Sequence, residues 1–235
     1  MTKPLLSKLA LAFGIALAGS APAGAVPSPA TGPTVVELFT SQGCSSCPPA
    51  NDNHAALGDR PDVLALSFGV TYWDQLGWKD TFAHPAFTNR QHVYARALGH
   101  SAPFTPQVVV NGRADVVGNK KGSIEALIRK SARRSGPAVN FEAGRLRVGS
   151  GEAPRGGADV WLIRYDPRTV PVPVRRGENG GRTLPHKNVV KDLIRLGDWA
   201  GAPVSYAVGG GAAGLRTAAI VQAKNGGPVL AAWKG

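Results

Sequence analysis

The sequence predicts an α/β protein with a mixed sheet, followed by a smaller antiparallel part resembling a β-sandwich. Three observations lead to this class. Apolar β-branched runs alternate with helical patterns up to about residue 135, and short strand-like runs separated by glycine-rich turns follow from about residue 138. The only two cysteines, Cys44 and Cys47, stand at the predicted start of a helix. Alternating strands and helices favour right-handed crossovers, so the first strands should be parallel.

The predicted order in the first part is β-α-β-α-β-β-α. Thr34–Thr40 is apolar and β-branched, which is typical of a buried strand. Two prolines follow the cysteines, and a helix tolerates proline only in its first turn. We therefore expect a helix that starts around the cysteines and ends near Leu57. Asn111-Gly112 predicts a hairpin. The other predicted elements are strand 63–70, helix 86–98, strands 107–111 and 114–117, and helix 122–134.

This order is that of thioredoxin, and it ends near residue 135. Ser135-Gly136-Pro137 marks the predicted boundary between a thioredoxin-like domain at 33–135 and a β-rich domain at 138–235. In the second domain, GENGGRTLPH predicts a hairpin tip with Arg182 and His186 exposed. The strand-like runs of this domain are 139–142, 145–148, 158–165, 189–196, 204–208, 215–223 and 229–233.

The first 25 residues have the pattern of a secretory signal peptide. Lys3 and Lys8 give a positive start, Leu9 to Ala18 is a short apolar core, and Ala23-Gly24-Ala25 matches a small-residue cleavage site. The apolar run is shorter than the roughly 20 residues of a membrane-spanning helix. We expect cleavage near Ala25/Val26 and a mature protein, without a transmembrane segment, that is periplasmic or secreted. Disulfides are permitted in such compartments.

The chain is strongly basic, with a formal net charge of +12 that falls by two, to +10, without the two lysines of the leader. The arginines are scattered, and the longest basic cluster, at 129–134, has no interleaved aromatic residues for base stacking. We therefore expect no nucleic-acid partner. A solvated basic surface of this kind favours contact with anionic membranes or cell-wall polymers.

The cysteine pair lies in SQGCSSCPPAN, three residues apart. On a helix this spacing is about one turn, so both sulfurs face the same side. The helix N-terminus favours a thiolate, which is the attacking species in disulfide exchange. Three uses stay open at this point: a redox pair, a locked disulfide and a metal site. A disulfide that closes so short a loop gains little stability from chain entropy, which favours the redox pair.

A metal site would combine the two thiolates with His54, and the ion would be copper or zinc. His84, His92 and His100 follow at intervals of eight. Eight residues advance about 80° beyond whole helical turns, so these three do not share one face. We expect surface histidines here and assign no metal ligand.

The segment YWDQLGWKD, at 72–80, is dense in aromatic and charged residues. Trp73 and Trp78 are candidate walls of a substrate groove. The alternative, slightly favoured, is that both rings pack against the domain interface and the neighbouring charges are solvated. Asp74 and Asp80 are candidate proton acceptors for a buried thiol.

Several long stretches resemble a family of secreted thioredoxin-like proteins catalogued only as a domain of unknown function. They are VELFTSQGCSSCPPAN, YWDQLGWKDTF, NRQHVYARALG, FTPQVVVNGR and, in the second half, GENGGRTLPHKNVVKDLIRLGDW. The resemblance implies a thioredoxin-like fold with a CxxC at Cys44 and Cys47. In such folds a cis-proline at the place of Pro106 lies against the cysteines and exposes backbone to substrate. Gly69 and Thr71 stand where the family pattern has His and Asp. For this chain, that puts in doubt any role that requires the His and Asp side chains.

The expected function is thiol–disulfide exchange on exported proteins. Cys44 would attack and Cys47 would resolve the mixed disulfide. The residues expected to hold substrate are Thr105, Pro106, Trp73 and Trp78, and those expected to tune the thiolate are Ser45 and Ser46. No cofactor is expected. With no further cysteine to relay electrons, an active enzyme would need an external redox partner.

Two alternatives from other classes accompany this expectation. One is a non-enzymatic periplasmic binding protein, in which the β-rich domain grips a partner and Cys44–Cys47 is a permanent disulfide. The other is a copper or zinc accessory protein. The reduction potential separates the first alternative from an exchanging pair, and retained metal would identify the second.

Overall fold

The computed structural model describes residues 1–2, 32–131 and 136–235. Apart from its first two residues, the predicted leader lies outside these ranges, as do the end of the helix predicted at 122–134 and Ser135 of the predicted boundary. Within the described residues, no helix is long and apolar enough to cross a membrane.

The first half has the predicted order of elements. The strands β1 and β2 are parallel, β3 runs antiparallel to β1, and β4 pairs with β3 through the hairpin at Asn111-Gly112. Every residue of β2 is buried, as expected for a strand covered on both faces. The elements are β1 (Thr34–Thr40), α1 (Pro48–Leu57), β2 (Val63–Gly69), the 3₁₀ helix η1 (Asp74–Leu76), α2 (Pro85–Ala97), β3 (Gln107–Val110), β4 (Ala114–Val117) and α3 (Lys121–Lys130).

The second half is made of strands. Two of them, β8 and β9, were not predicted, because each contains proline and neither has the pattern of a sheet strand. Pro171 and Pro185 lie opposite each other in this two-stranded ribbon, which fits the confinement of proline to edge strands. The strands are β5 (Val139–Glu142), β6 (Arg145–Val148), β7 (Ala158–Asp166), β8 (Val170–Pro173), β9 (Thr183–His186), β10 (Val189–Trp199), β11 (Val204–Ala207), β12 (Arg216–Ala223) and β13 (Val229–Lys234).

Both halves contribute to one eight-stranded mixed sheet in the described part of the chain, in the order β13-β12-β7-β10-β2-β1-β3-β4. This differs from the expectation of a separate antiparallel sandwich after residue 138. The join is the parallel contact of β10 with β2, where Val189 pairs with Ser67. Pairing β2 on this side satisfies backbone groups that would otherwise form an open sheet edge. The division into two domains stays a prediction, since continuous pairing alone does not define domains.

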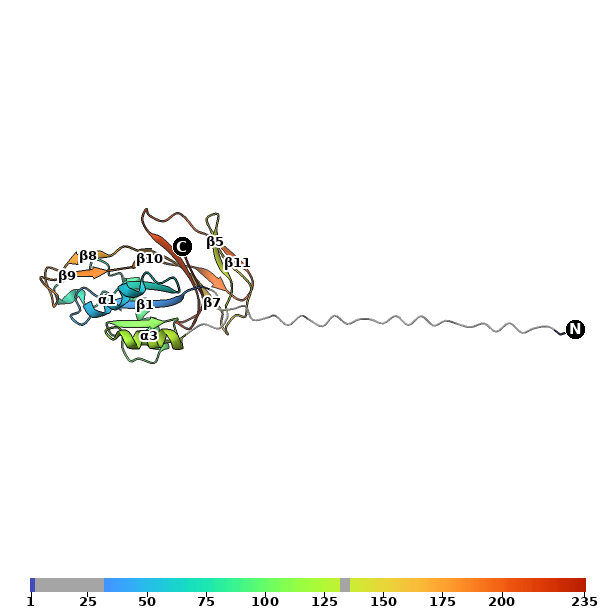
Figure 1. Ribbon diagram of the computed structural model, residues 1–235, viewed down its shortest axis with the longest axis horizontal. Coiled ribbons are helices and arrows are strands. Elements are labelled where there is room, and N and C mark those ends of the chain that lie inside the picture. The colour runs from blue at the N-terminus through green and yellow to red at the C-terminus, as the bar shows by residue number, and fades with distance from the viewer. Residues whose placement is uncertain (3–31, 132–135) are drawn as a thin grey trace.

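A three-stranded sheet, β11-β6-β5, packs on the far part of the large sheet. Its Leu146 and Val148 share a buried cluster with Val160 of β7 and with Trp199, which is fully buried. The two sheets thus share one buried cluster. Figure 1 places β5 and β11 at one end of the molecule, and β8 and β9 beside α1 at the other.

The helices cover the two faces of the large sheet. On one face, α1 and α3 bury Leu57, Ile124 and Ile128 against β1 and β3. On the other face, α2 buries Phe87 and Tyr94 in an aromatic cluster that also includes residues of β7, β10 and β12. Each large apolar side chain buried in this way contributes about 1.5–3 kcal/mol. The second half of the chain therefore completes the core on which α2 packs.

Asn188 secures the join between the halves. Its Nδ2 donates to the Ala65 carbonyl oxygen (2.9 Å), and its own carbonyl oxygen accepts from Ser67 N (2.9 Å). Its φ of 53° lies in the left-handed region, which asparagine tolerates better than most residues.

We expect Asn188→Ala to lower the free energy of unfolding more than Asn225→Ala, by about 1–3 kcal/mol. Asn225 has a similar φ of 59° but is exposed, so both changes carry the same backbone cost. Only Asn188→Ala also removes the donor that satisfies a buried carbonyl. Urea unfolding measures the difference, and equal losses would mean that the bond to Ala65 adds nothing.

Candidate functional site

The cysteines lie where β1 ends and α1 begins. Cys47 is the N-cap residue of α1, and its carbonyl oxygen accepts from Ala50 N and Asn51 N. Pro48 and Pro49 occupy the first turn, so the predicted use of the prolines and the predicted helix start are confirmed. Cys44 and Cys47 form a disulfide, with their Cα atoms 5.4 Å apart. Both residues are 0% exposed.

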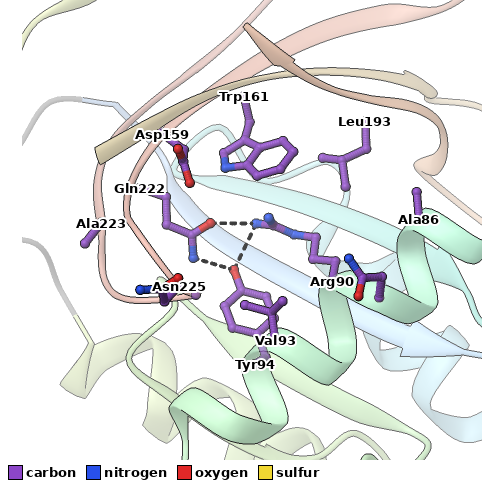
Figure 2. Close-up of a pocket in the computed structure, with 12 residues that line it drawn as sticks. Ala86, Arg90, Val93, Tyr94, Asp159, Trp161, Leu193, Gln222, Ala223 and Asn225 are labelled. Atoms are coloured by element: carbon purple, nitrogen blue, oxygen red, sulfur yellow. Dashed lines mark hydrogen bonds between the residues drawn. The ribbon is translucent and has the colours of Figure 1, made fainter. Parts of the chain in front are cut away.

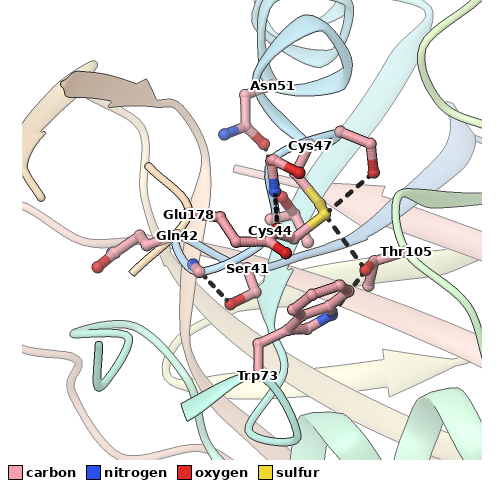
Figure 3. The surroundings of a disulfide bond; sticks show 12 residues. Ser41, Gln42, Cys44, Cys47, Asn51, Trp73, Thr105 and Glu178 are labelled. Carbon is pink, nitrogen blue, oxygen red and sulfur yellow. Dashed lines mark hydrogen bonds between the residues drawn. A yellow bond between two sulfur atoms is a disulfide. The ribbon is translucent and has the colours of Figure 1, made fainter. Parts of the chain in front are cut away.

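Two predicted site residues lie within hydrogen-bond distance of the sulfur of Cys44, and a third bonds to one of them. Thr105 Oγ1 donates to Cys44 Sγ (3.4 Å), and Ser46 Oγ lies 3.3 Å from the same sulfur. Trp73 Nε1 donates in turn to Thr105 Oγ1 (2.8 Å). The Thr105–Pro106 peptide bond is cis. Figure 3 shows the indole of Trp73 and the threonine on the same side of the disulfide.

Among the described residues, neither Trp78 nor Ser45 forms a hydrogen bond to a sulfur. Trp78 Nε1 donates to Gln42 Oε1 (2.9 Å), two residues before Cys44. The Ser45 side chain is exposed, and its backbone N–H points to Glu178 instead. The structure thus separates the predicted site into residues that touch the disulfide and residues that brace its loop.

Asp80 belongs to the bracing group. Its Oδ2 accepts from Gln42 N (2.7 Å) and its Oδ1 from Phe82 N (2.7 Å). Burial raises the pKa of this carboxyl. Asp74 accepts from Asp80 N (3.0 Å). Within the described residues, neither carboxylate bonds to a cysteine, so their assignment as proton acceptors stays a prediction.

The loop between β8 and β9 contributes two residues that the sequence did not reveal. Asn179 is fully buried, and its Nδ2 donates to the carbonyl oxygens of both Gln42 and Cys44 (2.9 Å each). Glu178 Oε2 accepts from Ser45 N (2.9 Å), and this bond lowers the pKa of the Glu178 carboxyl. We call this pair the Glu178–Asn179 clamp. Its Asn-Gly-Gly sequence signals a turn, but no sequence pattern points to a partner more than 130 residues away.

The family model described as "Protein of unknown function (DUF1223)" matches residues 35–222. The chain belongs to this family. The predicted resemblance to a family catalogued as a domain of unknown function is thereby confirmed. No curated protein matches the chain.

Two solved structures are similar to this DUF1223 protein. One is protein AGR_C_4864 from Agrobacterium tumefaciens, with 28% identity and a TM-score of 0.69, covering 87% of this chain and 94% of that one. The other is HBP35 of Porphyromonas gingivalis, with 13% identity and a TM-score of 0.57, covering 88% of this chain and 76% of that one. The second likeness concerns the fold alone.

Two histidines of this DUF1223 protein are buried where α1 faces β9. Burial, and secondarily the nearby His186, lower the pKa of His54 to about 3. Burial, and secondarily Lys191, lower the pKa of His186 to about 4. His186 is 3% exposed, so its predicted exposure at a hairpin tip is wrong, whereas Arg182 is exposed as predicted. The residue is held inside because β9 packs on α1.

The predicted histidine series is dispersed. His84 Nδ1 caps α2 by accepting from Ala86 N, and His100 pairs with Asp115. Among the described residues, no group of three or more His, Cys, Asp and Glu side chains is placed to hold a metal ion.

Acid should destabilise the fold through His54 and His186. Their folded pKa values lie below the unfolded value of about 6.5, so only the unfolded state binds protons as the pH falls from there toward 4. We expect the free energy of unfolding to be constant above about pH 6.5 and to fall below it, by about 1.4 kcal/mol per pH unit for each buried histidine. The raised pKa of Asp80 acts in the opposite sense.

His54→Leu should roughly halve this slope, measured by urea unfolding between about pH 4.5 and 7. His92→Leu, a change at an exposed position of α2, should keep the wild-type profile. A slope unaltered by His54→Leu would contradict the assignment.

The clamp should also control access to the disulfide. Asn179→Ala removes the two hydrogen bonds to the cysteine loop, together about 2 kcal/mol, and the bond that Asn179 Oδ1 accepts from Arg182 Nη1. Reduction by dithiothreitol should therefore quicken by at least about tenfold. The rate is followed by trapping the released thiols. Asn140→Ala, at an exposed asparagine of β5, is the matched control and should react at the wild-type rate. Equal rates for both variants would show that the clamp is not the barrier.

Proposed function

We propose that this protein is an exported, thioredoxin-like thiol–disulfide exchange protein that acts on the thiols and disulfides of other exported proteins. The observation that carries the proposal is the contact of Thr105, next to Pro106, with the sulfur of Cys44 at the start of α1. The order of sheet strands β2-β1-β3-β4, with helices on both faces, supports the thioredoxin-like assignment.

The surroundings favour Cys44 over Cys47 as the reactive thiolate. The hydroxyls of Thr105 and Ser46 both lie within hydrogen-bond distance of Cys44 Sγ. Hydrogen bonds to a charged form stabilise it, so two hydroxyl donors would favour the thiolate form of Cys44 in the reduced protein. Cys47 has no hydroxyl bonded to its sulfur in the described structure. This asymmetry supports an attacking Cys44 and a resolving Cys47.

The exchange is a two-electron transfer between two sulfur pairs. A substrate thiolate attacks Cys44 Sγ, the Cys44–Cys47 bond breaks, and Cys47 leaves as a thiolate. The second substrate thiolate then attacks the substrate sulfur of the mixed disulfide and releases Cys44. The substrate dithiol is oxidised to a disulfide, and the cysteine pair is reduced and takes up the protons. An external disulfide partner restores the oxidised pair, and the same steps run in reverse would reduce a substrate.

A second candidate function is supported by the burial of the cysteines. Because both residues are 0% exposed and Asn179 binds the backbone of Cys44, a substrate thiol reaches the sulfur only after local opening. A disulfide that never opens would be structural, and the protein would then be a binding protein.

The reduction potential of Cys44–Cys47 separates the two functions. We expect a value between about −120 and −270 mV in glutathione buffers with thiol trapping, the range of catalytic pairs. A value below about −300 mV would instead support a structural disulfide.

Single-cysteine variants test the roles of the two sulfurs. The model substrate is a protein that has been reduced and then reoxidised, so that it contains disulfides. Cys47→Ser should accumulate a mixed disulfide between Cys44 and this substrate, because the thiol that would resolve it is absent. Cys44→Ser should accumulate none. The reverse pattern would exchange the roles of the two cysteines.

A further inference from the structure

A pocket of about 260 Å³ lies on the face of the sheet covered by α2, and none of its lining residues belongs to the cysteine loop. Its sides come from both halves of the chain: α2 on one side, and β7, β10, β12 and the turn after β12 on the other. Figure 2 shows its polar side chains turned toward a common space. Concave pockets with a few convergent polar groups are typical of small-molecule sites.

Arg90, which lines the pocket, belongs to a buried ion pair. Arg90 is 7% exposed and Glu37 is 0% exposed; Arg90 Nε and Nη2 donate to the two carboxylate oxygens at 2.6 and 3.1 Å. Arg90 Nη2 also donates to Tyr94 Oη (2.9 Å) and Gln222 Oε1 (3.1 Å). Burying such a pair is costly unless its hydrogen bonds are satisfied.

One nitrogen of the guanidinium is left over. Arg90 Nη1 donates to no described group, and this atom is not fully buried. Because Arg90 lines the pocket, we infer that this nitrogen faces it. Because Glu37 already balances the charge of Arg90, Nη1 offers a hydrogen-bond donor rather than an uncompensated positive charge.

The opposite wall offers a hydrogen-bond acceptor, Asp159, whose negative charge is balanced by Arg195. Asp159 Oδ1 accepts from Arg195 Nε (2.8 Å), which leaves Oδ2 without a partner among the described residues. The guanidinium of Arg90 lies 5.5 Å from the centre of the Trp161 ring, beneath the indole in Figure 2. The remaining lining includes the apolar side chains of Ala86, Val93 and Leu193.

We propose that this pocket binds a small neutral ligand built on a secondary amide between apolar groups, which is the chemistry of a peptide bond. The carbonyl oxygen of the ligand accepts from Arg90 Nη1, and its N–H donates to Asp159 Oδ2. The apolar groups lie against Val93 and Leu193. The volume equals that of about nine water molecules, which suits a single capped amino acid. A charged ligand would bind less well, because its charge would lose water and find no unpaired charge of opposite sign in the pocket.

Wild-type protein and three probes of similar size test the ligand class. N-acetyl-valine methylamide is neutral, N-acetyl-valine is anionic and valine methylamide is cationic. We expect the neutral probe to shift the Trp161 indole NMR signal saturably, with a Kd of about 1 mM or tighter, and each charged probe to bind at least about tenfold more weakly. No saturable shift with the neutral probe, or equal binding of a charged one, would overturn the proposal.

A variant that fills the pocket tests its location. Ala86→Leu adds three carbons at the pocket wall and should weaken the neutral probe at least about tenfold. Ala97→Leu makes the same change at an exposed position of α2 and should leave Kd within about twofold. The NMR spectrum reports whether each variant is folded. Undiminished binding to folded Ala86→Leu would exclude this pocket, and the wild-type probe series decides the ligand class even if that variant does not fold.

Discussion

The parallel contact between β10 and β2 is the constraint on which the rest of the structure depends. It is short: one register pair, Val189 with Ser67, and the two hydrogen bonds of Asn188. Yet it makes a single sheet from strands on either side of residue 135. Because β9 leads directly into β10, the same contact brings the β8–β9 ribbon beside α1. The Glu178–Asn179 clamp reaches the cysteine loop only because the ribbon lies there.

The join also builds the face of the sheet opposite α1. Arg90 of α2 bonds to Glu37 of β1 in the first half and to Gln222 of β12 in the second. Tyr94 and Gln222 complete the network, since Gln222 Nε2 donates to the tyrosine oxygen (3.0 Å). A charge pair of this kind would be expensive to bury against an incomplete sheet. The core under α2 and the pocket beside it are therefore properties of the joined sheet, and of neither half alone.

Local patterns predicted most elements and failed where partners are distant in sequence. The bounds of β1, β4, β5 and β6 agree with the predicted runs, because alternation and turn residues are encoded within a few positions. The strands β8 and β9 were not predicted because their prolines are more typical of a loop than of a strand. The join of β10 to β2 escaped because alternation identifies a strand but not its neighbour.

The candidate site divides in the same way. Cys44, Cys47 and Pro106 carry local signatures, a CxxC before a helix and a proline before a strand. The contacts of Trp73 with Thr105, and of Asn179 with the Cys44 carbonyl, join segments 32 and 135 residues apart. His186 follows a turn signal, which predicts an exposed side chain. It is buried because β9 packs on α1, and the residues next to His186 in the sequence do not reveal that contact. Sequence thus identifies the reacting atoms better than it identifies what covers them.

What covers the disulfide also acts on its redox balance. The hydroxyls of Thr105 and Ser46 favour the Cys44 thiolate, and with it the reduced state, which raises the reduction potential. Glu178 acts in the opposite direction: its carboxylate occupies the Ser45 N–H and brings a negative charge to the same loop. Glu178 is exposed, so solvent weakens its effect, while the hydroxyls lie directly at the sulfur. The hydroxyl contacts should therefore dominate the potential, and the clamp should act mainly on the rate at which a substrate thiol reaches Cys44.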